Sequence, residues 1–187
     1  DFSMQELTLQ DLPVGIQDFE ILRQGNYLYV DKTEHLYRLA NTGKSYFLSR
    51  PRRFGKSLMI STLEMIFKAR KDLFENTWIL TSPKAANYAW KEHPVIRMDM
   101  GKMDTKTLEA FNQSLIDRVL EIARDYQITL REPFLGPPDA VNQLIDALVR
   151  ARNARVAVLI DEYDKPILDN ILDEKKAEEI RDILGRF

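Results

Sequence analysis

Gly55, Lys56 and Ser57 are the residues of this 187-residue chain whose types and order most clearly indicate a chemistry. In a phosphate-binding loop, backbone N–H groups surround phosphate oxygens, a lysine reaches the β- and γ-phosphates, and a hydroxyl coordinates Mg²⁺. The common pattern of this loop opens with a glycine, and Arg50 takes the place of that glycine here. The fixed φ angle of Pro51 would help the loop to turn without it. We therefore predict that this segment binds a nucleotide through its phosphates.

The surroundings of the loop distinguish it from a second Gly-Lys-Ser triplet at residues 43–45. That triplet follows apolar residues at helical spacing, so it is typical of the end of a helix. The triplet at 55–57 instead follows a strand-like segment at 46–49 and precedes an apolar, helix-like segment at 58–67. Strand, loop and helix is the order that a phosphate-binding loop requires, which favours this function over a basic surface loop. The residues that we expect to contact the nucleotide are Arg50, Pro51, Arg52, Arg53, Phe54, Gly55, Lys56, Ser57 and Leu58.

Asp161 and Glu162 form the second candidate group, because they follow the apolar segment 156–160. Such a segment predicts a buried parallel strand whose carboxyl end delivers carboxylates to a cleft. In ATPases with a phosphate-binding loop, an aspartate at this place helps to hold Mg²⁺. We predict that Asp161 and Ser57 serve the metal. Glu162 and Lys56 would serve catalysis, Glu162 by activating water and Lys56 by contacting the phosphates. A strand that simply stops at a charged turn is the alternative, which the upstream loop makes less favourable.

Alternating strand and helix patterns set these two groups in an α/β fold. The N-terminal region contains a predicted strand or hairpin at residues 27–30 and a helix at 32–41, for which Asp31 would be the N-cap. Further patterns predict a short helix at 84–90, a strand at 95–100, helices near 105–127 and 139–152, and an amphipathic helix within 173–187. This alternation predicts a three-layer sandwich with a mostly parallel sheet.

Four segments resemble the AAA-ATPase-like domain found in many bacterial proteins of unknown function. They are residues 12–19, 27–33, 47–57 and 159–164, which follow the order of the family and span most of the chain. The resemblance implies a fold of the P-loop NTPase type, with ATP and Mg²⁺ as ligands. It also implies an arginine at the position of Arg50. Tyr27 and Tyr29 lie where related ATPases contact adenine, although packing of the predicted strand is an alternative role for each.

The resemblance further implies segments that this sequence does not contain. A strand inserted between the loop strand and the Asp161 strand should follow residue 187, so we expect the fold to be incomplete here. Relatives commonly continue into a nuclease-like domain of the PD-(D/E)XK type, and we expect a C-terminal domain in this place. Within the chain, residues 1–42 would flank the nucleotide site and residues 43–187 would form the ATPase-like core.

Composition narrows the functional classes. The chain has a net charge of −2, 44% hydrophobic residues and no cysteine, and its apolar runs are too short for a membrane helix. A clearly basic domain would be expected of a nucleic-acid-binding protein. We therefore predict a cytoplasmic protein without membrane or nucleic-acid contacts in this segment.

Two hypotheses of different classes remain, together with a weaker third. The first is an ATPase whose hydrolysis of Mg·ATP drives a partner domain, with Arg50, Arg52 or Arg53 neutralising phosphate charge. The second is a nucleotide sensor or interaction module that does not hydrolyse, and self-association fits either hypothesis. Glu162 favours the first, because a sensor does not need an acid that activates water. A nucleic-acid-binding module that uses the three arginines is the third.

Overall fold

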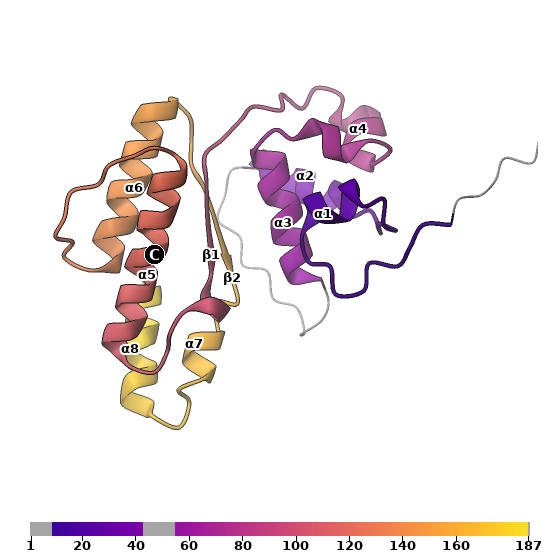
Figure 1. Cartoon of the computed structure of the whole chain (residues 1–187). Helices are drawn as coiled ribbons and strands as arrows, with labels where there is room; N and C mark the ends of the chain where they lie inside the picture. Colours follow the sequence, from indigo (N-terminus) through magenta and orange to yellow (C-terminus); the bar gives the residue numbers. More distant parts are fainter. Residues whose placement is uncertain (1–8, 43–54, 187) are drawn as a thin grey trace, which may run out of the picture. The chain divides into compact units, whose positions relative to one another are not determined.

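The computed structural model describes residues 9–42 and 55–186 (Figure 1). The chain divides into two compact units, unit 1 from Asp1 to Lys91 and unit 2 from Glu92 to Phe187. The sequence suggests a different division, between residues 42 and 43, which separates a segment flanking the nucleotide site from the ATPase-like core. That division stays a prediction.

Unit 1 is helical in its described part. Its elements are α1 (Phe19–Gln24), α2 (Thr33–Thr42), α3 (Lys56–Phe67), the 3-10 helix η1 (Lys71–Phe74), α4 (Trp78–Thr81) and the 3-10 helix η2 (Pro83–Ala85). The helices predicted at 32–41 and 58–67 are confirmed as α2 and α3. Both α1 and α2 pack against α3 (Figure 1). Buried side chains of α3 include Met59, Leu63 and Ile66, so the helix that begins at Lys56 lies at the centre of this unit.

Long-range hydrogen bonds attach α1 to the segment that includes and follows α3. The Phe19 N–H donates to Ser61 Oγ at 2.9 Å. The Arg23 guanidinium donates to the carbonyl oxygens of Leu73 (2.8 Å) and Glu75 (2.6 Å). These bonds join residues that are 42 to 52 positions apart in the sequence.

Seven aromatic rings form a continuous chain through unit 1. Neighbouring ring centroids lie 4.8–5.7 Å apart. Their order is Tyr29, Phe19, Phe74, Trp90, Tyr88, Tyr37 and Trp78. The rings are tilted or edge-on, the arrangement that the aromatic quadrupole prefers. Burial raises the pKa of both Tyr29 and Tyr88 above the ordinary value.

Two sequence predictions in unit 1 are wrong. Residues 27–30 form neither a strand nor a hairpin: Leu28 N–H donates to Asp11 O, and Tyr29 packs on Phe19. The helix predicted at 84–90 is reduced to the single turn η2, because Tyr88 and Trp90 turn into the aromatic chain. The backbone of Trp90 has a φ of 42°, which a helix does not allow.

Unit 2 combines two parallel strands with helices. Its elements are β1 (Val95–Asp99), the 3-10 helix η3 (Met100–Lys102), α5 (Leu108–Asp125), α6 (Pro137–Arg152), β2 (Ala157–Asp161), α7 (Lys165–Leu168) and α8 (Glu174–Leu184). Strands β1 and β2 pair in a register that runs from Val95 opposite Ala157 to Asp99 opposite Asp161. The predicted strands 95–100 and 156–160 are confirmed within one residue at each end, as are the long helices near 105–127 and 139–152 within three residues. The amphipathic helix within 173–187 is also confirmed, with Ala177, Ile180 and Leu184 buried.

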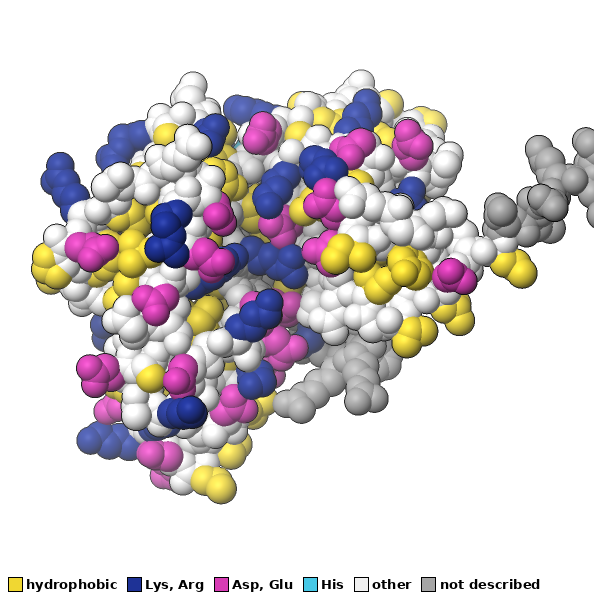
Figure 2. All heavy atoms as spheres, in the orientation of Figure 1, with side chains coloured by type: hydrophobic (Ala, Val, Ile, Leu, Met, Phe, Trp, Pro, Cys, Tyr) yellow, Lys and Arg dark blue, Asp and Glu magenta, His cyan; other side chains and the backbone are white. Residues whose placement is uncertain are grey.

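The core of unit 2 lies between β1 and helices α5, α6 and α8. Ile96 and Met98 of β1 pack in one buried cluster with Phe111 and Leu115 of α5 and Leu144 of α6. On the face that Figure 2 shows, acidic and basic side chains are interspersed over these helices. The core therefore fixes the strands, and the two strand ends that carry acids, relative to the helices.

The architecture confirms a mixed α/β fold with a small parallel sheet. The three-layer sandwich of the P-loop NTPase type stays a prediction, because the strand predicted at 46–49 lies outside the described residues.

Candidate functional site

The first turn of α3 carries the described part of the predicted phosphate-binding loop. Gly55 is the N-cap of α3 with a φ of 72°, a left-handed conformation that glycine adopts without steric cost. Lys56 and Ser57 are the first two helical residues, and the Gly55 carbonyl accepts a hydrogen bond from Met59 N–H at 3.0 Å. Within the described part of the chain, no side chain caps this helix start. Its first N–H groups, which have no partner within the helix, therefore suit an anion.

The remaining loop residues of the prediction lie outside the described residues. They are Arg50, Pro51, Arg52, Arg53 and Phe54, and their contacts with a nucleotide stay a prediction. Leu58 is placed in the first turn of α3, directly after Ser57.

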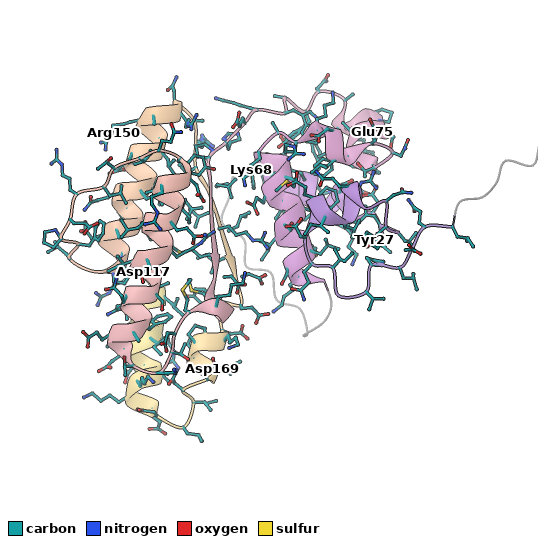
Figure 3. The ribbon with its side chains drawn as sticks, in the orientation of Figure 1. Tyr27, Lys68, Glu75, Asp117, Arg150 and Asp169 are labelled. Carbon is teal, nitrogen blue, oxygen red and sulfur yellow. The ribbon has the colours of Figure 1, made fainter. Side chains whose placement is uncertain are left out.

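Tyr27 and Tyr29, the predicted adenine contacts, line a polar pocket of about 570 Å³ in unit 1. Tyr27 and Glu75, labelled in Figure 3, both belong to its wall. The Tyr27 ring lies against Gly25, where an added Cβ would come within 2.3 Å of a ring carbon. The Arg23 guanidinium lies 5.9 Å from the centre of the Tyr29 ring.

This pocket lies beside the segment that follows α3. It borders on Leu73 and Glu75, which follow the carboxyl end of α3, whereas Lys56 lies at the amino end. The 12 residues of α3 span roughly 18 Å at 1.5 Å per residue. The contact of the two tyrosines with adenine stays a prediction.

Two aspartates end the two paired strands of unit 2. Asp161, the last residue of β2, is only 4% exposed, and its Oδ1 accepts a hydrogen bond from Glu162 N–H at 2.9 Å. Asp99, the last residue of β1, lies opposite Asp161 in the strand register. Sequence reasoning did not select Asp99. Its position at the end of a predicted strand, like that of Asp161, was the signal that could have found it.

Glu162 has an unusual backbone conformation. Its φ is 53°, in the left-handed region that side-chain-bearing residues avoid. The Glu162 carbonyl accepts a hydrogen bond from Lys165 N–H at 2.9 Å, which closes a turn into α7. A residue held in this region costs on the order of 1–3 kcal/mol, and such residues concentrate at functional sites.

A metal role for Ser57 and Asp161 is compatible with their oxygen ligands, which Mg²⁺ prefers. Among residues 9–42 and 55–186, no three or more His, Asp or Glu side chains group closely enough to hold a metal ion. Ser57 belongs to unit 1 and Asp161 to unit 2, so their joint action on Mg²⁺ stays a prediction, as does that of Lys56 with Glu162. None of the helices in the described ranges combines the length and hydrophobicity needed to cross a membrane.

Comparison with known proteins identifies the family. A family model described as "Predicted AAA-ATPase" matches residues 13–187. A curated relative, "Uncharacterized protein in vnfD 5'region" of Azotobacter chroococcum mcd 1, is 39% identical over 181 residues. The match covers 94% of this chain and 33% of the relative, so the chain spans about a third of that protein's length. No solved structure matches the chain. On the extent of the family match, the chain belongs to the predicted AAA-ATPase family.

Proposed function

We propose that this chain binds Mg·ATP and hydrolyses it, and that the hydrolysis drives or gates a partner domain. The observation that carries the proposal is the start of α3, where left-handed Gly55 precedes Lys56 and Ser57 in the first helical turn. A helix start of this kind offers N–H groups, a cation and a hydroxyl to a phosphate chain. Membership of the predicted AAA-ATPase family supports this assignment.

The residues of unit 1 would bind the phosphates. The Lys56 ammonium would neutralise the β- and γ-phosphates, and the Ser57 hydroxyl would coordinate Mg²⁺. Arg50, Arg52 or Arg53 would add bidentate hydrogen bonds to phosphate oxygens. When bound, Mg²⁺ supplies positive charge to the β- and γ-phosphate oxygens.

The residues of unit 2 would prepare the water. The buried Asp161 carboxylate, with Oδ1 held by a backbone N–H, would orient a metal-bound water through its second oxygen. The Glu162 carboxylate would accept a proton from the attacking water and so orient it toward the γ-phosphate. A sensor that binds without hydrolysis is the alternative. The presence of an acid at position 162, directly after Asp161, favours hydrolysis, because a sensor does not need an acid that activates water.

Partners and location complete the proposal. We propose that a C-terminal domain, nuclease-like in relatives, responds to the nucleotide state, with self-association and a cytoplasmic location. A direct nucleic-acid role for this segment is disfavoured by the net charge of −2 and by the interspersed charges on the face in Figure 2.

The test is the substitution Lys56→Ala. We expect it to abolish ATP binding in titration calorimetry and ATP hydrolysis in a phosphate-release assay, while the far-ultraviolet circular dichroism spectrum is unchanged. Lys68→Ala is the matched control, because Lys68 is the C-cap of the same helix and pairs with Glu64 at 2.7 Å (Figure 3). ATP affinity that is equal in wild type and Lys56→Ala would show that the nucleotide site is wrongly assigned.

A further inference from the structure

Gly101 is a glycine whose backbone does not require glycine. It lies in η3, directly after β1, and its φ lies outside the left-handed region. Gly15, Gly55 and Gly136, by contrast, have positive φ angles. The reason for a glycine at position 101 must therefore lie in the space around its Cα.

That space is filled by three side chains. A Cβ added at Gly101 would meet Asp99 Oδ1 at 3.0 Å, Glu162 Cγ at 3.3 Å and Lys165 Cδ at 3.4 Å. The first two distances are tighter than most real Cβ contacts, whereas the third is ordinary van der Waals contact, so a side chain at position 101 would push Asp99 and Glu162 aside. The Glu162 side chain therefore passes directly over the η3 turn.

Asp99 fixes the turn over which Glu162 passes. Its Oδ1 accepts a hydrogen bond from Gly101 N–H at 2.9 Å, and Asp99 is itself held in the register of β1 with β2. On the other side, the Lys165 ammonium pairs with Asp169 at 2.9 Å, which anchors the aliphatic part of Lys165. The first atoms of the Glu162 side chain are therefore confined between the η3 turn, which Asp99 holds, and the aliphatic part of Lys165.

We propose that Asp99 and Gly101 are positioning residues that aim the Glu162 carboxylate. The proposal rests on the proposed function, in which Glu162 activates water. A left-handed backbone sends the Glu162 side chain in a direction that neighbouring groups must support. Asp99 fixes the turn, and Gly101 leaves room for Glu162 Cγ to approach it. Neither residue contacts the nucleotide in this mechanism.

Gly101→Ala is the first test. We expect kcat for ATP hydrolysis to fall about 10- to 100-fold, because small misplacements of a reacting group have effects of this size. The KM for ATP and the Kd from calorimetry should not change, because phosphate binding is assigned to unit 1. Lys106→Ala is the control in the loop that follows the turn, since Lys106 is exposed, and it should leave kcat unchanged. Unchanged kcat in Gly101→Ala overturns the proposal.

The Asp99 substitutions separate geometry from charge. Asp99→Ala removes the acceptor for Gly101 N–H and should lower kcat as Gly101→Ala does. Asp99→Asn retains an acceptor oxygen and should restore most of the turnover. If the asparagine variant is as slow as the alanine variant, the charge of Asp99 acts directly on the reaction and the positioning role is refuted.

Double variants show whether Gly101 acts through Glu162. In a Glu162→Gln background, Gly101→Ala should cause no further fall in hydrolysis, because the group that it misplaces no longer works. An equal fall in both backgrounds would make the two residues independent and overturn the proposal.

The contact can also be measured without turnover. Denaturant unfolding of Gly101→Ala, Glu162→Ala and the double variant should be non-additive, because removal of the Glu162 side chain relieves the crowding. Additive effects refute the contact. If the wild type does not hydrolyse ATP, the proposed function fails, whereas this coupling still decides whether the turn holds Glu162.

Discussion

Glu162 has a strained backbone just after the end of β2, and the proposed function gives its side chain a catalytic role. Its φ of 53° is tolerated because Asp161 Oδ1 binds its N–H and Lys165 N–H binds its carbonyl. Glycine would adopt this backbone without strain. A glutamate at this position therefore lowers the free energy of unfolding relative to glycine, but it provides a carboxylate.

The first prediction concerns Glu162→Gly. We expect the free energy of unfolding to rise by about 1 kcal/mol, because the left-handed strain is removed. Under the proposed function, ATP hydrolysis should be lost, since the carboxylate proposed to activate water is absent. Chemical denaturation followed by circular dichroism, together with a phosphate-release assay, measures both effects.

Gln127→Gly is the matched control for this prediction. Gln127 has a φ of 58° in an exposed turn after α5, and no catalytic role is assigned to it. It should gain stability in the same way without loss of hydrolysis. A Glu162→Gly variant that hydrolyses ATP at the wild-type rate would contradict the assigned role.

Residue patterns predicted the positions of Lys56 and Ser57 at the start of a helix, because a phosphate-binding loop is encoded locally. Asp99 and Gly101 could not be found in this way. Their relation to Glu162 depends on the register of β1 with β2, which joins residues about sixty positions apart. No short sequence window contains that information.

At the scale of elements, Asp31 joins the starts of two helices. Its Oδ1 accepts a hydrogen bond from Thr33 N–H at 2.8 Å in α2, and its Oδ2 accepts one from Trp78 N–H in α4. Thr33 Oγ1 adds a bond from Ile79 N–H at 3.1 Å. One carboxylate therefore satisfies N–H groups in two first turns that would otherwise lack partners.

The second prediction concerns Asp31→Ala. We expect it to lower the free energy of unfolding of unit 1 by about 2 kcal/mol, because each lost cap contributes about 1 kcal/mol. Tryptophan fluorescence during denaturation reports on unit 1 alone, since Trp78 and Trp90 are the two tryptophans of the chain.

Asp18→Ala provides the comparison for this prediction. Asp18 caps only α1, through Ile21 N–H at 2.9 Å, so its loss should cost about half as much. Equal effects of the two substitutions would show that the second bond of Asp31 contributes nothing.

Long helices were predictable, whereas short ones were not. The apolar spacing of α5, α6 and α8 extends over several turns and identifies each helix directly. Helices α1 and α4 have six and four residues, which is too short for a periodic pattern or for stability in isolation. They form because caps and buried contacts from distant residues hold them.

At the scale of the whole molecule, shifted pKa values link stability to both ends of the pH range. In unit 1, burial raises the pKa of Tyr29 and Tyr88, so the neutral phenols stabilise the folded state. This stability is fully present below the ordinary tyrosine pKa of about 10 and is lost as the pH rises through the raised values. In unit 2, the Arg118 guanidinium lowers the pKa of Glu121, so that contribution is present above the ordinary carboxyl range and lost as the pH falls.

The third prediction follows from the tyrosines of unit 1. Tryptophan fluorescence should report unfolding that begins above about pH 10, where unfolded tyrosines ionise. Tyr88→Phe should move this alkaline transition to higher pH, because one buried ionisable phenol is removed. Tyr163→Phe, in unit 2, is the control and should leave the transition in place. An alkaline transition that is the same in wild type and Tyr88→Phe would contradict the role of Tyr88.

The α/β class of the molecule was predictable from the alternation of strand and helix patterns. The layer arrangement was not, because strand order is set by contacts between segments rather than by the pattern within each. Trp90 illustrates the same limit, since its neighbours in the aromatic chain override the helix expected at 84–90.

The bonds that attach α1 to residues 42 to 52 positions later also have a consequence for synthesis. A ribosome adds about 5–20 residues per second, so α1 is made about 2–10 s before its partners. A six-residue helix is not stable alone, and Phe19 and Leu22 lack their burial during this interval. Unit 1 therefore folds only after Glu75 has been made, and a pause in translation before that codon prolongs the exposure of its nascent core.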